Sequence, residues 1–576
     1  MEKVRITSFE EAESYLNQLP VMTAKHTMEE TKAYLHKLGD TDRRMHIIHV
    51  AGTNGKGSVC AYLRYILEDM GKQVAVFTSP HLVDIRERFL IKGQIPSKET
   101  FLQAFLQIYD SLDWEALAAG EGYHPTYFEY LFFIAMILFD REDLDYCILE
   151  TGLGGRLDAT NAVGKKELSV ITHISLDHVA LLGHTIAAIA REKAGIMQAG
   201  CRAVYWENSE EKRRKEVHPA EYASAKGHCV KEADSLMFDC DMESALSIDR
   251  NRVEKDSSAI FRERAQNLEI EAFPVSKNDY LNLKINPKSI DFLYKSRYDK
   301  KGIPLRIHTK ALYQVENATL AARAAEVLFE KEVVLASALQ EGIAKCFWAG
   351  RMEEVLPEVY VDGAHNEDGI RAFLDSVALD GWQGERILLC SVVSDKEYDK
   401  MFEKVTASGL FSHLAVAGMH SARGLSMTKL EEMLEQYLPG QKLPWQEEIL
   451  LAEPEQPKQK KVLQEEAGQP KQKKALQEEP EQPKQKKALQ EEPEQHKESH
   501  KGCTYTMYTS VAEGLKAVLA EQRSRLSRKS GSRNLKNRAD EKECDCQKAA
   551  PAVRIYAAGS LYLVGEIKEL LSHDKF

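Results

Sequence analysis

Residues 47–58, with the sequence IIHVAGTNGKGS, decide the fold that we expect, because an apolar run here breaks into glycines, a lysine and a hydroxyl. The apolar part predicts a buried strand, and a helix is expected to begin near Ser58. Small residues between the two would let backbone N–H groups converge on an anion, next to the positive end of the helix dipole. Lys56 would neutralise phosphate oxygens, and Ser58 would offer an oxygen to Mg2+. The stretch therefore predicts a phosphate-binding loop at Asn54, Gly55, Lys56, Gly57 and Ser58.

The spacing of this loop departs from the common pattern G-x-x-x-x-G-K-[ST]. Only two residues separate Gly52 from Gly55, and an extra glycine, Gly57, follows the lysine. The alternative is a glycine turn that binds nothing. We disfavour that alternative because a strand is expected before the turn and a helix after it, with Lys-Gly-Ser between them.

Strands and helices are expected to alternate after the loop. A helix over 59–70 stops at Gly71, a strand follows over 73–78, and a long apolar helix over 127–140 precedes a strand over 145–149. Strand, loop, helix, strand is the pattern of a parallel sheet, whose ligands collect at the carboxyl ends of the strands. The sequence therefore predicts an α/β fold with a site at that edge, and the remaining, antiparallel strands of the sheet are expected between 207 and 309.

Polar side chains follow the predicted strands at this edge. Ser79 follows the strand over 73–78, Glu150 follows the strand over 145–149, and His178 lies shortly after a strand over 168–174. A single carboxylate or histidine in such a place is more often structural. Together with Ser58 of the loop they favour a magnesium site, because oxygen ligands at strand ends hold Mg2+ beside a nucleotide.

Composition excludes several classes of protein. With 77 Lys+Arg against 89 Asp+Glu and a net charge of −12, the 576-residue chain carries no basic patch for nucleic acid. Its longest apolar run, 130–139, is too short to span a bilayer, and no secretory signal is visible.

The cysteines and the length of the chain indicate its location and its number of domains. The ten cysteines are scattered and form no disulfide framework, so we expect a cytoplasmic protein. The length of 576 residues suggests two domains.

Five segments, in order, resemble the ATPase domain of folylpolyglutamate synthases, in the Mur ligase superfamily of ATP-dependent amide ligases. The resemblance implies a Mur-ligase-like P-loop domain followed by a smaller Rossmann-like α/β domain. It also implies that Ser79, Glu150 and His178 ligate magnesium and that Lys193 is carbamylated. The segments are AGTNGKGS (51–58), TSPHL (78–82) with ERF (87–89), LETGLGGRLDATN (149–161), THISLDHVALLGHT (172–185) and IAREKAGI (189–196).

A carbamate on Lys193 makes physical sense, because an ammonium would repel a neighbouring divalent cation whereas a carbamate can orient its waters. Burial and nearby cations would favour the neutral amine that must form first, since both lower the pKa of a lysine. The alternative is a plain salt bridge from Lys193 to a phosphate or carboxylate. The sequence leaves both open.

Two later segments resemble nucleotide-binding elements of the same family. Residues 312–318 resemble the element HQ-x-x-NA, except that Tyr313 replaces the histidine, and Asn317 would contact the nucleotide. Residues 347–353 resemble the hinge W-P-G-R with alanine in place of proline, and Arg351 would reach the ATP phosphates.

A second α/β domain is expected after the hinge. The segment DGAHN begins with Asp362, which the resemblance places against the nucleotide, and it follows a strand expected over 358–361. Further strands are expected over 386–393, 410–418 and 552–558, each followed by a helix. The expected domains are 1–346 for the ATP-binding ligase, 347–356 for the hinge and 357–576 for the glutamate-ligase domain. A low-complexity insertion at about 444–502, built on a thirteen-residue Gln/Lys/Glu/Pro repeat, and a charged one at about 523–549 interrupt the second domain.

The resemblance implies a ligase that uses ATP and Mg2+ to join L-glutamate to a folate, or to dihydropteroate, through an acyl phosphate. Lys56, His178 and Lys193 would be the catalytic residues. Which acceptor is used stays open. A cell-wall amide ligase of the Mur type, a P-loop phosphotransferase and a non-catalytic nucleotide-binding module are the alternatives. We expect a monomer with small-molecule substrates and neither nucleic acid nor membrane as a partner.

Overall fold

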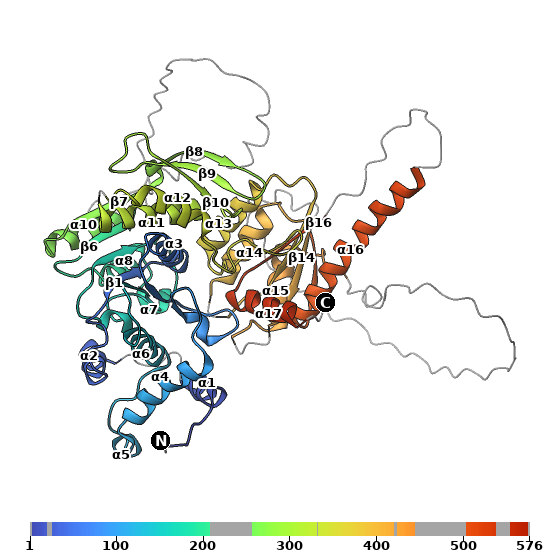
Figure 1. Ribbon diagram of the computed structural model, residues 1–576. Coiled ribbons are helices and arrows are strands. Elements are labelled where there is room, and N and C mark those ends of the chain that lie inside the picture. Colours follow the sequence, from blue (N-terminus) through green and yellow to red (C-terminus); the bar gives the residue numbers. More distant parts are fainter. Residues whose placement is uncertain are drawn as a thin grey trace, which may run out of the picture.

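The computed structural model describes most of the chain as two α/β units that lie side by side (Figure 1). No helix among the described residues is long and apolar enough to cross a membrane. The expected insertion at 444–502 and residues 537–549 of the one expected at 523–549 lie outside the described residues. These are 3–19, 26–207, 256–330, 332–394, 396–419, 423–443, 503–536 (side chains to 525) and 553–573.

Seven strands form the first sheet, in the order β3-β2-β4-β1-β5-β6-β7. β1 is central, and every neighbouring pair is parallel except β3 with β2. Helices cover both faces, which is why the central strands read as continuous apolar runs. The expected parallel α/β fold is confirmed. The strands are β1 (His46–Ala51), β2 (Val74–Phe77), β3 (Phe89–Ile91), β4 (Tyr146–Glu150), β5 (Leu168–Ile171), β6 (Arg202–Trp206) and β7 (Ala272–Val275).

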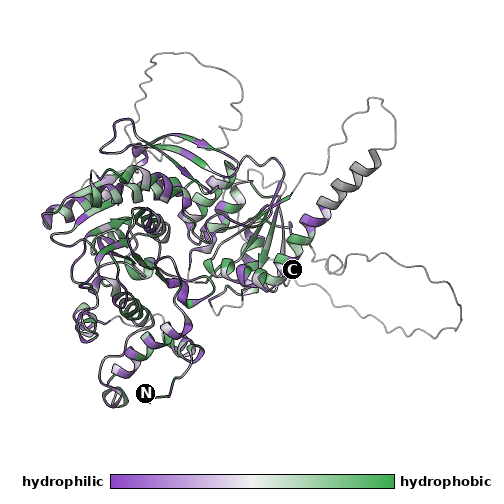
Figure 2. Cartoon of the chain, viewed as in Figure 1, coloured by the Kyte–Doolittle hydropathy of each residue, from purple (hydrophilic) through white to green (hydrophobic). Residues whose placement is uncertain are grey.

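The helices of the first unit divide between the two faces of this sheet. α1, α2, α4 and α6 share one core, and α3, α11 and α12 share the other. α6 is hydrophobic around its whole circumference because it is buried on all sides (Figure 2). The helices are α1 (Phe9–Gln18), α2 (Met28–Lys37), α3 (Lys56–Asp69), α4 (Lys98–Ser111), α5 (Trp114–Ala118), α6 (Tyr127–Asp140), α7 (Val179–Leu182), α8 (Ile186–Ala194), α10 (Ser257–Asn267), α11 (Gln314–Phe329) and α12 (Leu335–Lys345).

A separate antiparallel sheet of three strands covers α12 at the top of Figure 1. It comprises β8 (Tyr280–Ile285), β9 (Ile290–Tyr294) and β10 (Ile303–Ile307), in the order β10-β9-β8. We expected antiparallel strands of the main sheet between 207 and 309. Instead, β7 extends the main sheet in parallel and the antiparallel strands form a sheet of their own.

The second unit is built on a six-stranded sheet in the order β11-β12-β16-β13-β14-β15, parallel except for β11. The sequence indicated four of these strands, and β11 and β15 were not anticipated. The elements are β11 (Glu353–Leu356), β12 (Val359–Val361), α13 (Glu367–Ala378), β13 (Glu385–Cys390), α14 (Tyr398–Ala407), β14 (His413–Ala417), α15 (Met427–Tyr437), β15 (Thr504–Tyr508), α16 (Val511–Lys536), β16 (Val553–Ala558) and α17 (Leu561–Ser572).

Both predicted insertions border the second sheet. Lys442 forms a parallel bridge with Tyr505, and the Leu443 N–H donates to the Tyr505 carbonyl over 2.8 Å, so the chain leaves and re-enters at the edge strand β15. α16 continues to Lys536, into the stretch where the charged insertion was expected to begin. The division at 346 and 356 remains a prediction.

Candidate active site

The phosphate loop, residues 52–58, connects β1 to α3 in a conformation that requires glycine at two places. Gly52 has a φ of +155°, and a Cβ there would lie 1.7 Å from Thr172 Oγ1. Gly55 has a φ of +90°, and a Cβ there would lie 2.3 Å from Asn317 Oδ1. The helix begins at Lys56, two residues earlier than expected. Its free N–H groups and dipole therefore face the loop.

Lys56 and Lys193 both point their ammonium groups into this loop. Lys56 Nζ donates to the Gly52 and Thr53 carbonyls, each over 3.1 Å. Lys193, from the last turn of α8, donates to the Gly52 carbonyl over 2.7 Å and is 4% exposed. Burial, with the nearby charge of Lys56, lowers the pKa of Lys193 to about 7. Two lysine side chains thus converge where an anion would bind.

Glu150 and Ser79, two of the predicted metal ligands, lie next to each other and near Lys56. Glu150 ends β4, is 3% exposed and accepts a hydrogen bond from the Ser79 N–H over 3.1 Å. Burial raises its pKa, and the charges of Lys56, Arg351 and Arg88 act in the opposite direction. A divalent cation would offset the cost of this buried carboxylate.

Ser58 supplies a further buried oxygen next to the loop. Ser58 is 1% exposed, and its hydroxyl accepts from Gln314 Nε2 over 3.1 Å. Serine hydroxyls and a carboxylate are hard oxygen donors, so Ser58, Ser79 and Glu150 fit the preference of Mg2+.

His178 is placed differently from the other predicted metal ligands. Its Nε2 lies 3.3 Å from Lys396 Nζ, and Lys396 also donates to Asp177 over 2.6 Å. Burial lowers the pKa of His178 to about 4, so the ring is neutral at neutral pH. Across the part of the chain that is described, no contact joins His178 to Glu150 or Ser79, and no group of three His, Cys, Asp or Glu could hold a metal.

The remaining predicted nucleotide residues come from the hinge, the second unit and α11. Asp362, 2% exposed, accepts from the Met352 and Ala364 N–H groups, each over 2.9 Å. Arg351 acts electrostatically on both Asp362 and Glu150. Asn317, from α11, donates to Gln314 Oε1 over 3.0 Å. The structure therefore brings the loop, Glu150, Ser79, Lys193, Asn317, Arg351 and Asp362 together around one region.

Sequence reasoning missed the direct contacts between the loop and the second unit. Asn366 Nδ2 donates to Asn54 Oδ1 over 3.0 Å, and Asp368 pairs with His173 at 2.9 Å. Lys396 adds the ion pair with Asp177 described above. Asn366 lies in the segment DGAHN, which begins with Asp362. Membership of this segment was the sequence feature that could have identified Asn366 as a site residue.

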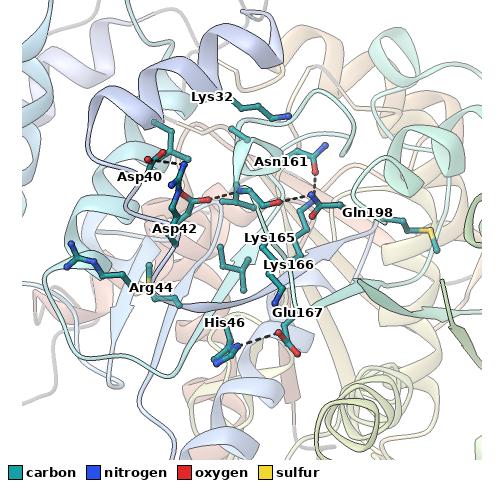
Figure 3. Close-up of a pocket in the computed structure, with 18 of the residues that line it drawn as sticks. Lys32, Asp40, Asp42, Arg44, His46, Asn161, Lys165, Lys166, Glu167 and Gln198 are labelled. Carbon is teal, nitrogen blue, oxygen red and sulfur yellow. Dashed lines mark hydrogen bonds and ion pairs between the residues drawn. The ribbon is translucent and has the colours of Figure 1, made fainter. Parts of the chain in front are cut away.

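A separate pocket of about 890 Å3 lies at the opposite edge of the first sheet, beside the amino ends of β1 and β5 (Figure 3). At its floor Lys166 donates to Asn161 Oδ1 over 2.5 Å and to the Ile196 carbonyl over 2.9 Å. Burial lowers the pKa of Lys166 to about 7. None of the predicted site residues lines this pocket.

Comparison with known proteins agrees with this architecture. Residues 50–245 match the model of the Mur ligase middle domain family. A dihydrofolate synthase/folylpolyglutamate synthase of Bacillus subtilis is 30% identical over 414 residues, which cover 71% of this chain and 85% of that protein. Escherichia coli FolC in complex with DHPP and ADP is similar in structure, with a TM-score of 0.63, 21% identity and 99% of each chain covered.

A second solved structure shares the fold to the same degree. It is the bifunctional folylpolyglutamate synthase/dihydrofolate synthase of Yersinia pestis, complexed with AMPPNP and a Mn ion. Its TM-score is 0.62 and its identity 21%, with 98% of each chain covered.

Proposed function

The chain belongs to the folylpolyglutamate synthase/dihydrofolate synthase family, and on this premise we propose that the residues converging on its phosphate loop join L-glutamate to a folate. The protein is an ATP-dependent ligase. The observation that carries the assignment of its site is that Lys56, Lys193 and Glu150 meet at one loop, opposite Arg351 and Asp362 of the hinge and second unit.

The chemistry follows from what each group can do. A carboxylate resists attack by an amine because it is anionic and has no good leaving group. Transfer of the γ-phosphoryl group of ATP to one carboxylate oxygen gives an acyl phosphate, which the glutamate amine attacks with loss of phosphate. Lys56, Arg351 and the amides of the phosphate loop stabilise the charge that develops during the transfer.

Ser58, Ser79 and Glu150 would hold the magnesium ion, which when bound supplies charge neutralisation at the phosphates. The use of a divalent metal is supported by the Yersinia pestis structure, which contains a Mn ion together with AMPPNP. His178 would join these ligands only after it loses its contact with Lys396. Lys396 would then be free to act on another anion.

Closure of the two units over the substrates would keep water from the acyl phosphate. The contacts of Asn366 and Lys396 with the first unit support such a closure. We also propose that the chain divides into residues 1–346, a hinge at 347–356 and residues 357–576. We further propose that the protein is a monomer and that it is cytoplasmic. The cytoplasmic location is supported by the cysteines among the described residues, which are free thiols, as in a reducing compartment.

The activity is tested by phosphate release with tetrahydrofolate or dihydropteroate as acceptor, with and without L-glutamate. We expect release that depends on glutamate with at least one acceptor, and mass spectrometry should find the acceptor extended by one glutamate. Release that ignores glutamate would favour a phosphotransferase. Turnover of a cell-wall nucleotide precursor instead would favour another amide ligase of the Mur type.

Carbamylation of Lys193 is proposed because a pKa of about 7 leaves much of its amine neutral at physiological pH. The folded-state pKa lies below the unfolded value, so burial of this group destabilises the fold below pH 7 and ceases to do so as the pH rises toward the unfolded pKa. The neutral amine, and with it the carbamate, should therefore increase as the pH rises through 7.

We expect carbon-13-labelled bicarbonate to give a carbamate NMR signal that grows through this pH range and disappears in Lys193→Met. Activity of the native protein should rise with added bicarbonate at constant pH. Lys166→Met is the matched control, because Lys166 is equally buried with a similarly lowered pKa but lies at the other edge of the sheet. A native spectrum without any signal would leave Lys193 as a plain salt-bridge residue.

A further inference from the structure

The segment immediately before α11 is attached to the second unit, although α11 itself packs in the first. Ala311 is fully buried in the core around α13 and β13 of the second unit. The Leu312 N–H donates to Ser376 Oγ of α13 over 3.0 Å. Lys310 Nζ lies 4.7 Å from the centre of the Tyr360 ring on β12. The two units are thus joined here as well as at the hinge.

Tyr313 ends this segment and contacts a residue of the proposed nucleotide site. Its hydroxyl donates to Asp362 Oδ2 over 2.5 Å. The other hydrogen bonds to this carboxylate come from the backbone of Met352 and Ala364, close to Asp362 in sequence. Within the described residues, Tyr313 is therefore the donor that links Asp362 to the first unit.

The next residue makes the corresponding contact with the phosphate loop. Gln314, the first residue of α11, is 4% exposed and donates to Ser58 Oγ over 3.1 Å. Its Oε1 accepts from Asn317, whose own side chain lies against Gly55. Two consecutive residues thus bind Asp362 on one side and Ser58 on the other.

We propose that Tyr313 is a positioning residue that couples the placement of Asp362 to the orientation of Ser58. A shift of the second unit that moves Asp362 would move the Tyr313 hydroxyl and, through the peptide bond to Gln314, the partner of Ser58. Nucleotide would then bind best when both units are in place. The inference rests on the proposed roles of Ser58 and Asp362 and adds a connection between them.

A purely structural role for the ring is the competing explanation, because Tyr313 also packs against the core of the second unit. Tyr313→Phe keeps the ring and removes only the hydroxyl. Tyr505→Phe is a matched control, since the Tyr505 hydroxyl also donates to a carboxylate, Glu435 Oε1, over 2.5 Å but lies on β15, at the edge of the sheet away from β12.

We expect Tyr313→Phe to raise the KM for ATP and the Mg2+ concentration for half-maximal activity by on the order of tenfold, as for loss of a hydrogen bond to a buried charged group. The KM for the folate acceptor should stay unchanged. Tyr505→Phe should leave all three constants at their native values, whatever it does to the melting temperature.

A double-mutant cycle separates coupling from two independent effects. If Tyr313 acts through Gln314, then Gln314→Ala combined with Tyr313→Phe should raise the KM for ATP by clearly less than the product of the single effects. Multiplicative effects, or a Tyr313→Phe protein that behaves like Tyr505→Phe, would overturn the inference. A native protein without glutamate-dependent phosphate release would instead overturn the proposed function, so the two failures are distinguishable.

Discussion

Lys56→Ala is expected to lower ATP turnover by on the order of 10³-fold, as loss of one charge-stabilising donor at a transition state does. The Lys56 ammonium is held over the loop by the Gly52 and Thr53 carbonyls, where it would meet the transferred phosphoryl group. Its position at the start of α3 tolerates alanine, so the fold should remain intact. Phosphate release and circular dichroism measure the two effects.

Lys300→Ala serves as the control for Lys56→Ala, because Lys300 is an exposed lysine between β9 and β10. It should retain native turnover. Near-normal ligation by Lys56→Ala would show that the phosphate loop is wrongly assigned. Loss of turnover together with loss of the circular dichroism spectrum would mean that Lys56 is needed for folding. We do not expect this result, because among the described residues the Lys56 ammonium donates hydrogen bonds only to carbonyl groups of the loop.

The second large effect is expected for Glu150→Gln, which keeps the shape of the side chain and removes its charge. Activity at a fixed Mg2+ concentration should fall by about 10²-fold or more, and part of it should return at high Mg2+. Since burial raises the pKa of Glu150, its charged form destabilises the fold above the unfolded pKa. The melting temperature at neutral pH should therefore not fall.

Glu326→Gln should show the opposite behaviour. Glu326 has a side chain that is 1% exposed, pairs with Arg323 at 3.2 Å and accepts from the Tyr294 hydroxyl over 2.6 Å. Removal of its charge leaves Arg323 partly unpaired, so stability should fall while the Mg2+ dependence stays native. An unchanged Mg2+ titration in Glu150→Gln would discard the proposed metal site.

The residues of the phosphate loop and of the strand ends could be anticipated because each follows a short, strongly apolar strand. A parallel sheet brings such strand ends to one edge regardless of how many residues separate them. That is why Glu150 lies beside Ser79 and near Lys56, as expected. The same reasoning placed His178 at the edge but could not show that Lys396 and Asp177 would surround it.

Contacts between the two units lay beyond sequence reasoning. Asn54 and Asn366 are separated by 312 positions, and no local periodicity relates them. The roles of Tyr313 and Gln314 also depend on where the second unit sits. The strand β15 was missed because it is only five residues long and lies between two stretches of unusual composition. Its residues are of mixed polarity, so no hydrophobic periodicity distinguishes them from a loop.

The attachment of residues 443 and 503 to one edge strand has a consequence for how this chain can vary. The ends of the intervening stretch are held together by the pairing of Leu443 with Tyr505, so added length costs only the slowly growing entropy of a longer closed loop. β14, β13 and β16 separate this edge from β12, which directly precedes Asp362. We therefore expect a change in the number of repeat units to leave catalysis undisturbed, which makes this position a natural place to attach a reporter.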